Sequence, residues 1–252
     1  MNSRTGCTGG RSKIGRLSPI VHFQYAVLLV EAALRVCSAA SKCRSYFLYE
    51  VIELGMDFTA YMSHSLNKSE IADLCNRLNE NPTSFPLLQA FIDELLPFNP
   101  RKIEKEWHVD FDYIGGTTIL AGPCGISLTL SENVCYFHHY LRWRQFLINP
   151  DLQIMLRKVC YELREIFNAS FVIYVPDNAA RESAIMDFIW EGENRDIDYM
   201  REWLLVNCGP PKNKIVHIYK KLVDSWESDG YYIDYFQDRE KLLKTSAIDK
   251  SR

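Results

Sequence analysis

The spacing of apolar residues changes twice along this 252-residue chain, and this change most limits the folds that it can adopt. Up to about residue 98, apolar residues recur three and four positions apart, which is typical of helices. Between Trp107 and Ser131 they alternate with polar residues, which is typical of strands with one buried face. From Leu152 to Ile166 the helical spacing returns. Separate runs of helical and strand-like sequence predict an α+β fold.

The first part of this pattern predicts a helical segment over residues 17–100. Asn67, with Glu70 three residues later, is the pattern of a capping box at the start of a helix. The apolar stripe that follows consists of Ile71, Leu74, Cys75 and Leu78. A further helix is expected to begin near Ser84 or Pro86, and Pro97 closes it. Its apolar positions are Leu88, Phe91, Ile92 and Leu95.

The middle of the chain predicts an α+β domain over residues 101–240. The alternation and the glycine-rich turns favour an antiparallel meander covering about 104–137, with an apolar face that needs a cover. Asn149-Pro150 places a cap residue before a proline at the first helical position. The helix that follows has apolar residues at steps of four and three, namely Leu152, Leu156, Val159, Leu163 and Ile166. We expect this long amphipathic helix to lie on the meander.

Further helices and strands are expected toward the C-terminus. They are a buried strand from Phe171 to Val175, a helix from Asp177 or Asn178 to about Trp190, a helix from Tyr199 to Val206 and a strand from Tyr231 to Phe236. Residues 215–226 fit a helix, although 215–219 also fit a strand. Residues 241–252 are expected to form a loose polar tail.

The charges are distributed unevenly. Arg4, Arg11, Lys13 and Arg16 precede the first acidic residue, Glu31, so residues 17–252 hold 25 of the 29 Lys and Arg against 32 Asp and Glu, a formal charge of -7. This acidic balance speaks against nucleic acid as a partner. A basic leader before the apolar run 20–37 is also the pattern of a targeting leader. Polar residues interrupt that run, so we expect a disordered basic tail over 1–16 and no membrane span. A cleaved leader, or a start nearer Met56, is the alternative.

The eight cysteines indicate a reducing compartment. They form no CxxC pair and no short Cys/His ladder of the kind that binds structural zinc. Cys75 and Cys160 fall at apolar positions of helical patterns, where a thiol behaves as a small buried side chain. We therefore expect a cytoplasmic protein without a cofactor.

Two groups of residues are candidates for chemistry. Cys135, His138 and His139 form a compact group in which an imidazole could activate a thiolate, although no nearby Asp or Asn orients the imidazole. His108, Asp110 and Asp112 share one face of a strand and are possible metal ligands. Alternate strand residues are about 6.6 Å apart at Cα, so three from one strand rarely converge on one ion. A structural pair and a solvated sheet face are the more common explanations.

Two further groups are candidates for binding a partner protein. Arg142, Trp143 and Arg144 combine guanidinium groups with an indole, a combination that anchors protein interfaces. The alternative is that Trp143 packs inward while the arginines pair with acids such as those at 191–198. The acidic group is Glu191, Glu193, Asp196 and Asp198. It suits a basic partner, although it also fits a solvated loop.

Two classes of function remain open. The first is a non-catalytic binding or regulatory protein, similar in role to an immunity or adaptor protein, that docks a partner through its acidic and aromatic surface. The second is a small hydrolase or transferase whose site is assembled only in three dimensions. The chain contains no glycine-rich phosphate loop, nucleophile elbow or metal-ligand ladder, which favours the first class.

Overall fold

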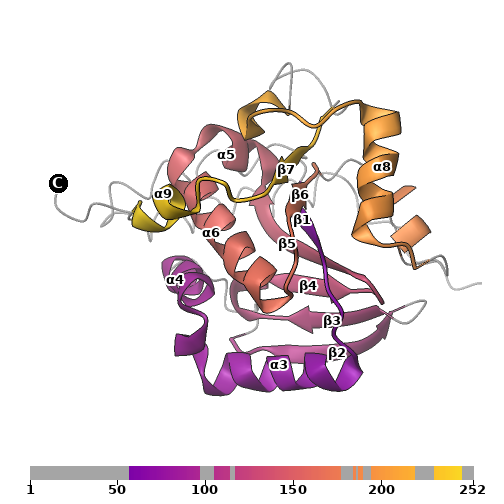
Figure 1. The fold of residues 1–252 in the computed structure, drawn as a ribbon. Coiled ribbons are helices and arrows are strands. Elements are labelled where there is room, and N and C mark those ends of the chain that lie inside the picture. The colour runs from indigo at the N-terminus through magenta and orange to yellow at the C-terminus, as the bar shows by residue number, and fades with distance from the viewer. Residues whose placement is uncertain are drawn as a thin grey trace, which may run out of the picture. The chain divides into compact units, whose positions relative to one another are not determined.

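One antiparallel sheet forms the centre of the structure. A computed structural model describes residues 57–96, 105–113, 117–176, 184–185, 187–189, 194–218 and 230–245, which all belong to one unit, residues 55–252. The strands in these residues are β1 (Asp57–Ser63), β2 (His108–Tyr113), β3 (Thr117–Ala121), β4 (Ser127–Leu130), β5 (Val134–Arg142), β6 (Val172–Tyr174) and β7 (Tyr232–Asp234). They lie in the order β2-β3-β4-β5-β1-β6-β7, and every neighbouring pair is antiparallel (Figure 1).

Helices separate and follow the strands in the described residues. The α-helices that the structure describes in full are α3 (Lys68–Glu80), α4 (Pro86–Leu95), α5 (Trp143–Ile148), α6 (Pro150–Ile166), α8 (Ile197–Cys208) and α9 (Arg239–Lys244). Short 3-10 helices are η2 (Pro82–Ser84), η4 (Pro123–Gly125) and η5 (Ile215–His217). The α+β class predicted from the sequence is confirmed. None of the helices in the described residues is long and apolar enough to cross a membrane.

The meander predicted for residues 104–137 is confirmed. Strands β2 to β5 follow one another both along the chain and across the sheet, and β5 continues past the predicted end to Arg142. At the outer edge, the Asn79 side chain donates to the carbonyl of Trp107 (2.8 Å) and accepts from its N–H (2.9 Å). The Asn79 amide thus satisfies edge backbone groups that would otherwise be open to pairing with another chain.

The helical prediction is wrong for residues 57–63, which form β1. This strand lies in the middle of the sheet, with β5 on one side and β6 on the other. Phe58, Ala60 and Met62 pack on one face, and Tyr61 packs on the other. A strand buried on both faces shows no alternation of polar and apolar residues. Its sequence therefore does not distinguish it from a buried stretch of helix.

Helix α3 is confirmed together with its predicted cap. The side-chain oxygen Oδ1 of Asn67 accepts hydrogen bonds from the backbone N–H groups of Ser69 (2.9 Å) and Glu70 (3.1 Å). In return, the Glu70 carboxylate accepts a hydrogen bond from the backbone N–H of Asn67 (2.8 Å). This reciprocal pair satisfies N–H groups that the helix itself leaves open. The four residues of the predicted apolar stripe are all buried.

Helix α4 is confirmed from Pro86, with its four predicted apolar residues buried. Its N-terminus is capped from another element: the Glu162 carboxylate of α6 accepts hydrogen bonds from the N–H groups of Leu87 (3.1 Å) and Leu88 (2.7 Å). A carboxylate at a helix N-terminus is also favoured by the helix dipole. This contact fixes α4 against α6.

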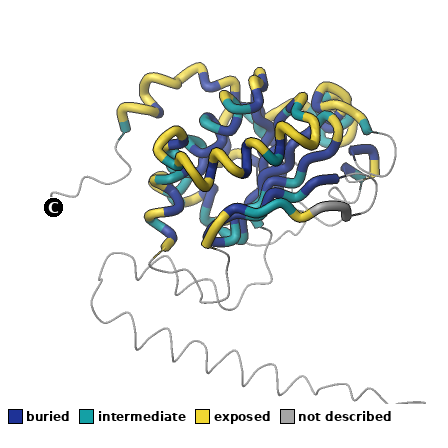
Figure 2. The backbone as a smooth tube through the Cα atoms, turned by 90° about the horizontal axis from the view of Figure 1, so that it is seen from below, coloured by how far each residue is buried: buried dark blue, intermediate teal, exposed yellow. Residues whose placement is uncertain are grey.

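Helix α6 covers the meander, as the sequence predicts. Asn149 accepts hydrogen bonds from the N–H groups of Asp151 and Leu152 at its start. Leu156, Val159 and Leu163 are buried in one cluster with residues of α3, α4, α5 and one face of the sheet. Figure 2 shows the result, with strands mostly buried and helices alternating between buried and exposed residues.

Helix α8 packs on the opposite face of the sheet. Its inward residues Ile197, Met200 and Leu204 form a second cluster with Tyr61, Tyr136 and strands β6 and β7. β6 and β7 confirm the strands predicted near 171–175 and 231–236, and α8 confirms the helix predicted over 199–206. The sheet therefore has one face covered by α3, α4 and α6, and an opposite face on which α8 packs.

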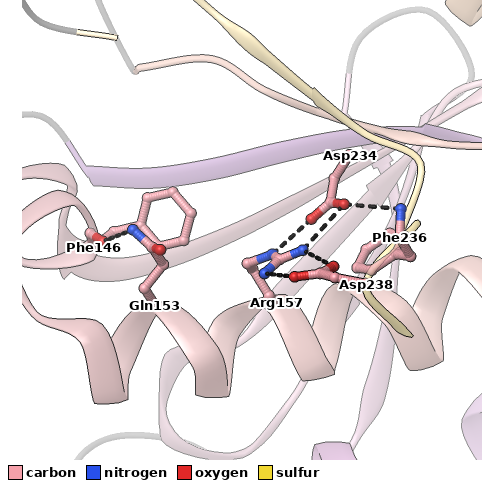
Figure 3. A network of polar contacts seen from close by, with 6 residues as sticks. All are labelled: Phe146, Gln153, Arg157, Asp234, Phe236 and Asp238. Atoms are coloured by element: carbon pink, nitrogen blue, oxygen red, sulfur yellow. Dashed lines mark hydrogen bonds and ion pairs between the residues drawn. The ribbon is translucent and has the colours of Figure 1, made fainter. Parts of the chain in front are cut away.

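The C-terminal part of the described chain is tied to α6 by an ion-pair network (Figure 3). Arg157 donates from Nε to Asp234 (2.7 Å) and from Nη2 to Asp238 (2.8 Å), and the Asp234 carboxylate also accepts from the Phe236 N–H (2.9 Å). Lys158 donates to the Thr245 carbonyl (2.5 Å). The network joins α6 to both β7 and α9.

The remaining C-terminal predictions have mixed outcomes. The prediction of a loose tail is wrong for residues 241–244, because α9 runs to Lys244 and buries Leu242 against the core. Residues 215–217 form the 3-10 helix η5, so the strand alternative is wrong there, and most of the predicted helix over 215–226 lies outside the described residues. The predictions for 1–56, 219–229, 246–252 and most of the helix over 177–190 lie outside the described residues.

Candidate functional site

The structure separates the predicted Cys135, His138 and His139 group. All three lie within strand β5, where successive side chains point to opposite faces. Cys135 is fully buried in the core with Phe137, and burial raises the pKa of its thiol. A thiol without contact with solvent and with a raised pKa is a poor nucleophile. His138 lies on the other face of the strand, so it cannot activate Cys135.

His139 is a structural residue of the core. Its Nδ1 accepts a hydrogen bond from the Leu141 N–H (3.0 Å), so the imidazole proton is on Nε2 and is donated to the Cys124 carbonyl (3.1 Å). Burial lowers the pKa of His139 to about 3. The neutral ring fixes the turn at Cys124, a non-glycine residue with a φ of 59°. His139 is therefore committed to the fold and not to a reaction.

His138 instead belongs to a polar cluster on the opposite face of the sheet. Its Nε2 lies 3.6 Å from Asp57 Oδ2, and the other carboxylate oxygen of Asp57 accepts a hydrogen bond from Arg142 Nη1 (2.5 Å). Ser127 of β4 is the direct cross-strand partner of His138. No local pattern indicates this cluster, because Asp57 and Arg142 are 85 residues apart and meet only through the pairing of β1 with β5.

The predicted metal ligands His108 and Asp110 lie on the edge strand β2. His108 Nε2 is 3.7 Å from Asp110 Oδ2, and both side chains are exposed to solvent. The side chain of Asp112 lies outside the description. Among the described residues, no three His, Cys, Asp or Glu side chains lie close enough to hold one metal ion.

The predicted cluster of Arg142, Trp143 and Arg144 is divided between surface and core. Trp143 is 1% exposed and stacks on Phe58 at a centroid distance of 5.9 Å. The prediction that Trp143 binds a partner is therefore wrong, because its ring is buried in the core and a partner cannot reach it. Arg142 pairs with Asp57, and Arg144 is exposed.

The predicted acidic group lies at and before the start of α8. Asp196 is the N-cap of this helix, and its carboxylate accepts a hydrogen bond from the Tyr199 N–H (2.8 Å). Asp198 pairs with Arg201 at 3.0 Å. Glu191 and Glu193 lie outside the described residues.

The outward side of α8 also exposes large apolar side chains. We call it the α8 surface; its residues are Asp198, Tyr199, Glu202, Leu205 and Val206. Val206 is 82% exposed and Leu205 is 52% exposed, whereas residues of the inward side are buried. Residues at these spacings lie on one side of a helix. The sequence pattern placed this helix correctly but did not identify the exposed apolar pair.

Comparison with known proteins identifies no relative: no family model, no curated protein sequence and no solved structure matches this chain significantly.

Proposed function

We propose that this protein binds another protein through the α8 surface. The observation that carries the proposal is the exposure of Leu205 and Val206 on the same side of α8 as Asp198 and Glu202. Single exposed apolar residues are common on protein surfaces. Here two adjacent apolar residues, Leu205 and Val206, lie on the same side of one helix as the acidic residues. Protein interfaces combine apolar and polar residues in this way, with an apolar centre and a polar rim.

The helix holds these side chains in a fixed arrangement. Ile197, Met200 and Leu204 anchor the inward side in the second core cluster, and the Asp196 cap fixes the first turn. A surface that is ordered before binding loses less conformational entropy when the partner arrives. The acidic residues favour a partner segment that carries Lys or Arg beside apolar side chains, because opposite charges speed association and select the partner.

The experiment compares variants of the α8 surface in quantitative pull-downs from host-cell extract. Leu205→Ser/Val206→Ser removes the apolar pair, and Asp198→Lys/Glu202→Lys reverses the charge while keeping the Asp196 cap. A matched control, Asp73→Lys/Glu80→Lys, makes the same change of charge at exposed positions of α3. We expect a protein that is captured by the wild type and the control and is lost from both α8 variants.

The captured partner is then purified and its association rate measured at low and high salt. Charge reversal at Asp198 and Glu202 should slow association and flatten its salt dependence, because screened long-range attraction contributes mainly to the association rate. A set of captured proteins that is the same for all four forms would contradict docking through the α8 surface.

A further inference from the structure

Three residues of complementary chemistry lie on one face of the sheet, each on a different neighbouring strand. Ser127 of β4 stands directly opposite His138 of β5, and Asp57 of β1 faces the imidazole from the other side, at 3.6 Å. Side chains directly opposite in an antiparallel pair have Cβ atoms about 4.5–5.5 Å apart, so a rotation about the Ser127 side chain brings its hydroxyl into reach of the ring.

We propose that Ser127, His138 and Asp57 form a serine-nucleophile site that hydrolyses carboxylic esters. Ser127 is the nucleophile, His138 is the general base and Asp57 is the positioning residue. Nucleophile, base and orienting acid recur on unrelated folds in any chain order, and they are recognised by geometry rather than by sequence position.

The reaction conserves atoms and charge in two steps. The Ser127 oxygen attacks the ester carbonyl while His138 takes the hydroxyl proton, and the tetrahedral adduct then expels the alcohol, which leaves with that proton. The product of the first step is an acylated Ser127. In the second step water attacks the acyl group, His138 again takes and returns a proton, and the carboxylic acid and the free serine are released.

Asp57 is held in place for its role by Arg142. One carboxylate oxygen accepts the Arg142 hydrogen bond, which leaves the other facing His138. An orienting carboxylate fixes the tautomer of the imidazole and stabilises the imidazolium that forms during attack.

The site is partly open to solvent, unlike the groups around His64, His139 and Ser131. The side chains of His138 and Asp57 are 30% and 24% exposed. In contrast, His64 and His139 are buried, and the Ser131 hydroxyl is committed to a hydrogen bond with the Val134 carbonyl. Within the described residues, the Ser127 hydroxyl makes no hydrogen bond of its own. Ser127 is likewise half-buried, so part of this residue and part of the imidazole opposite it are accessible to a substrate.

The test uses a fluorophosphonate probe, which phosphonylates an activated serine oxygen and releases fluoride. The full-length chain should be labelled at Ser127, as located by peptide mass spectrometry, and should hydrolyse p-nitrophenyl acetate. Ser127→Ala should abolish both signals. Thr129→Val, on the same face two residues further along β4, is the matched control and should leave both unchanged.

The two supporting roles are separated by further variants. His138→Ala should slow labelling about 100-fold or more, and added imidazole should restore part of the rate. Asp57→Asn should lower the maximal labelling rate without raising the half-saturating probe concentration, and Asp57→Glu should restore part of it. A merely structural role for His138 would give no rescue by imidazole. Circular dichroism checks that each variant folds.

A wild-type chain that takes no label overturns the proposal, and so does a Ser127→Ala variant that is labelled as fast as the wild type. Either result leaves docking through the α8 surface unaffected, because that surface shares no residue with this site.

Discussion

Two buried histidines determine how the stability of this protein responds to acid. His64 repeats the arrangement of His139: its Nδ1 accepts from the Leu66 N–H (3.2 Å), and its Nε2 donates to the Ser131 carbonyl (2.9 Å). Burial lowers the pKa of both rings, that of His139 to about 3 from an ordinary value of 6.5. Protonation therefore favours the unfolded chain, in which these rings are exposed.

Stability should accordingly be complete above pH 6.5 and fall as the pH drops from 6.5 toward 3. His139 alone should remove about 2 kcal/mol of unfolding free energy between pH 7 and pH 5. Urea unfolding at pH 7, 6 and 5 measures this loss. Glu162, whose pKa is raised above its ordinary value of 4.5 by burial, has the opposite effect and offsets part of this loss. An unfolding free energy that is constant or rising toward pH 5 would refute the assignment of neutral buried rings.

At the scale of helices and strands, elements with local signals were predictable and the central strand was not. The cap of α3 at Asn67 and the start of α6 at Asn149-Pro150 involve residues only a few positions apart. β1 has no such signal, because its burial depends on β5 and on β6, which follow it by many residues. The Asp57 and His138 contact depends on the same pairing, so no spacing in the sequence could reveal it.

The same reasoning predicts which helix residues carry stability. Leu156 is fully buried where α6 crosses the sheet, so Leu156→Ala should cost about 2–5 kcal/mol through lost burial and the cavity left behind. Leu152, one turn earlier on α6, is only partly buried and serves as the matched control. Urea unfolding of both variants should show a clearly smaller loss for Leu152→Ala. Equal losses would mean that α6 does not lie on the sheet as described.

For the molecule as a whole, the two faces of the sheet differ in the polar groups that they carry and in how far these groups are buried. Helices α3, α4 and α6 bury one face, and the groups there are neutral or engaged, as His139 and Cys135 illustrate. The opposite face carries Ser127, His138 and Asp57 with part of their surface in solvent, while α8 covers its other end through the second cluster. A change at an exposed residue of that face should therefore disturb the packing of the covered face little.

Arg157 connects α6 to the C-terminal elements β7 and α9. Replacing Arg157 tests whether these elements unfold together with the rest of the unit. Arg157→Met leaves the Asp234 carboxylate, which is 2% exposed, without its cation. Breaking one partner of a buried ion pair typically costs about 3–5 kcal/mol. Arg157 joins α6 to both β7 and α9, so we expect the whole loss of unfolding free energy to appear in one cooperative urea transition. Tryptophan fluorescence monitors this transition.

The double variant Arg157→Met/Asp234→Asn distinguishes a lost attraction from a stranded charge. Asparagine removes the charge and keeps an oxygen that can accept the Phe236 N–H, so the double variant should be more stable than Arg157→Met alone. Lys158→Met, at the next position of α6, removes only a contact to the Thr245 carbonyl and should cost far less. If the double variant were no more stable than the single one, the buried charge of Asp234 would not be what Arg157 is needed to neutralise. The ion pair would then act only as a surface contact, and β7 and α9 would depend on apolar packing such as that of Phe236 against Tyr161.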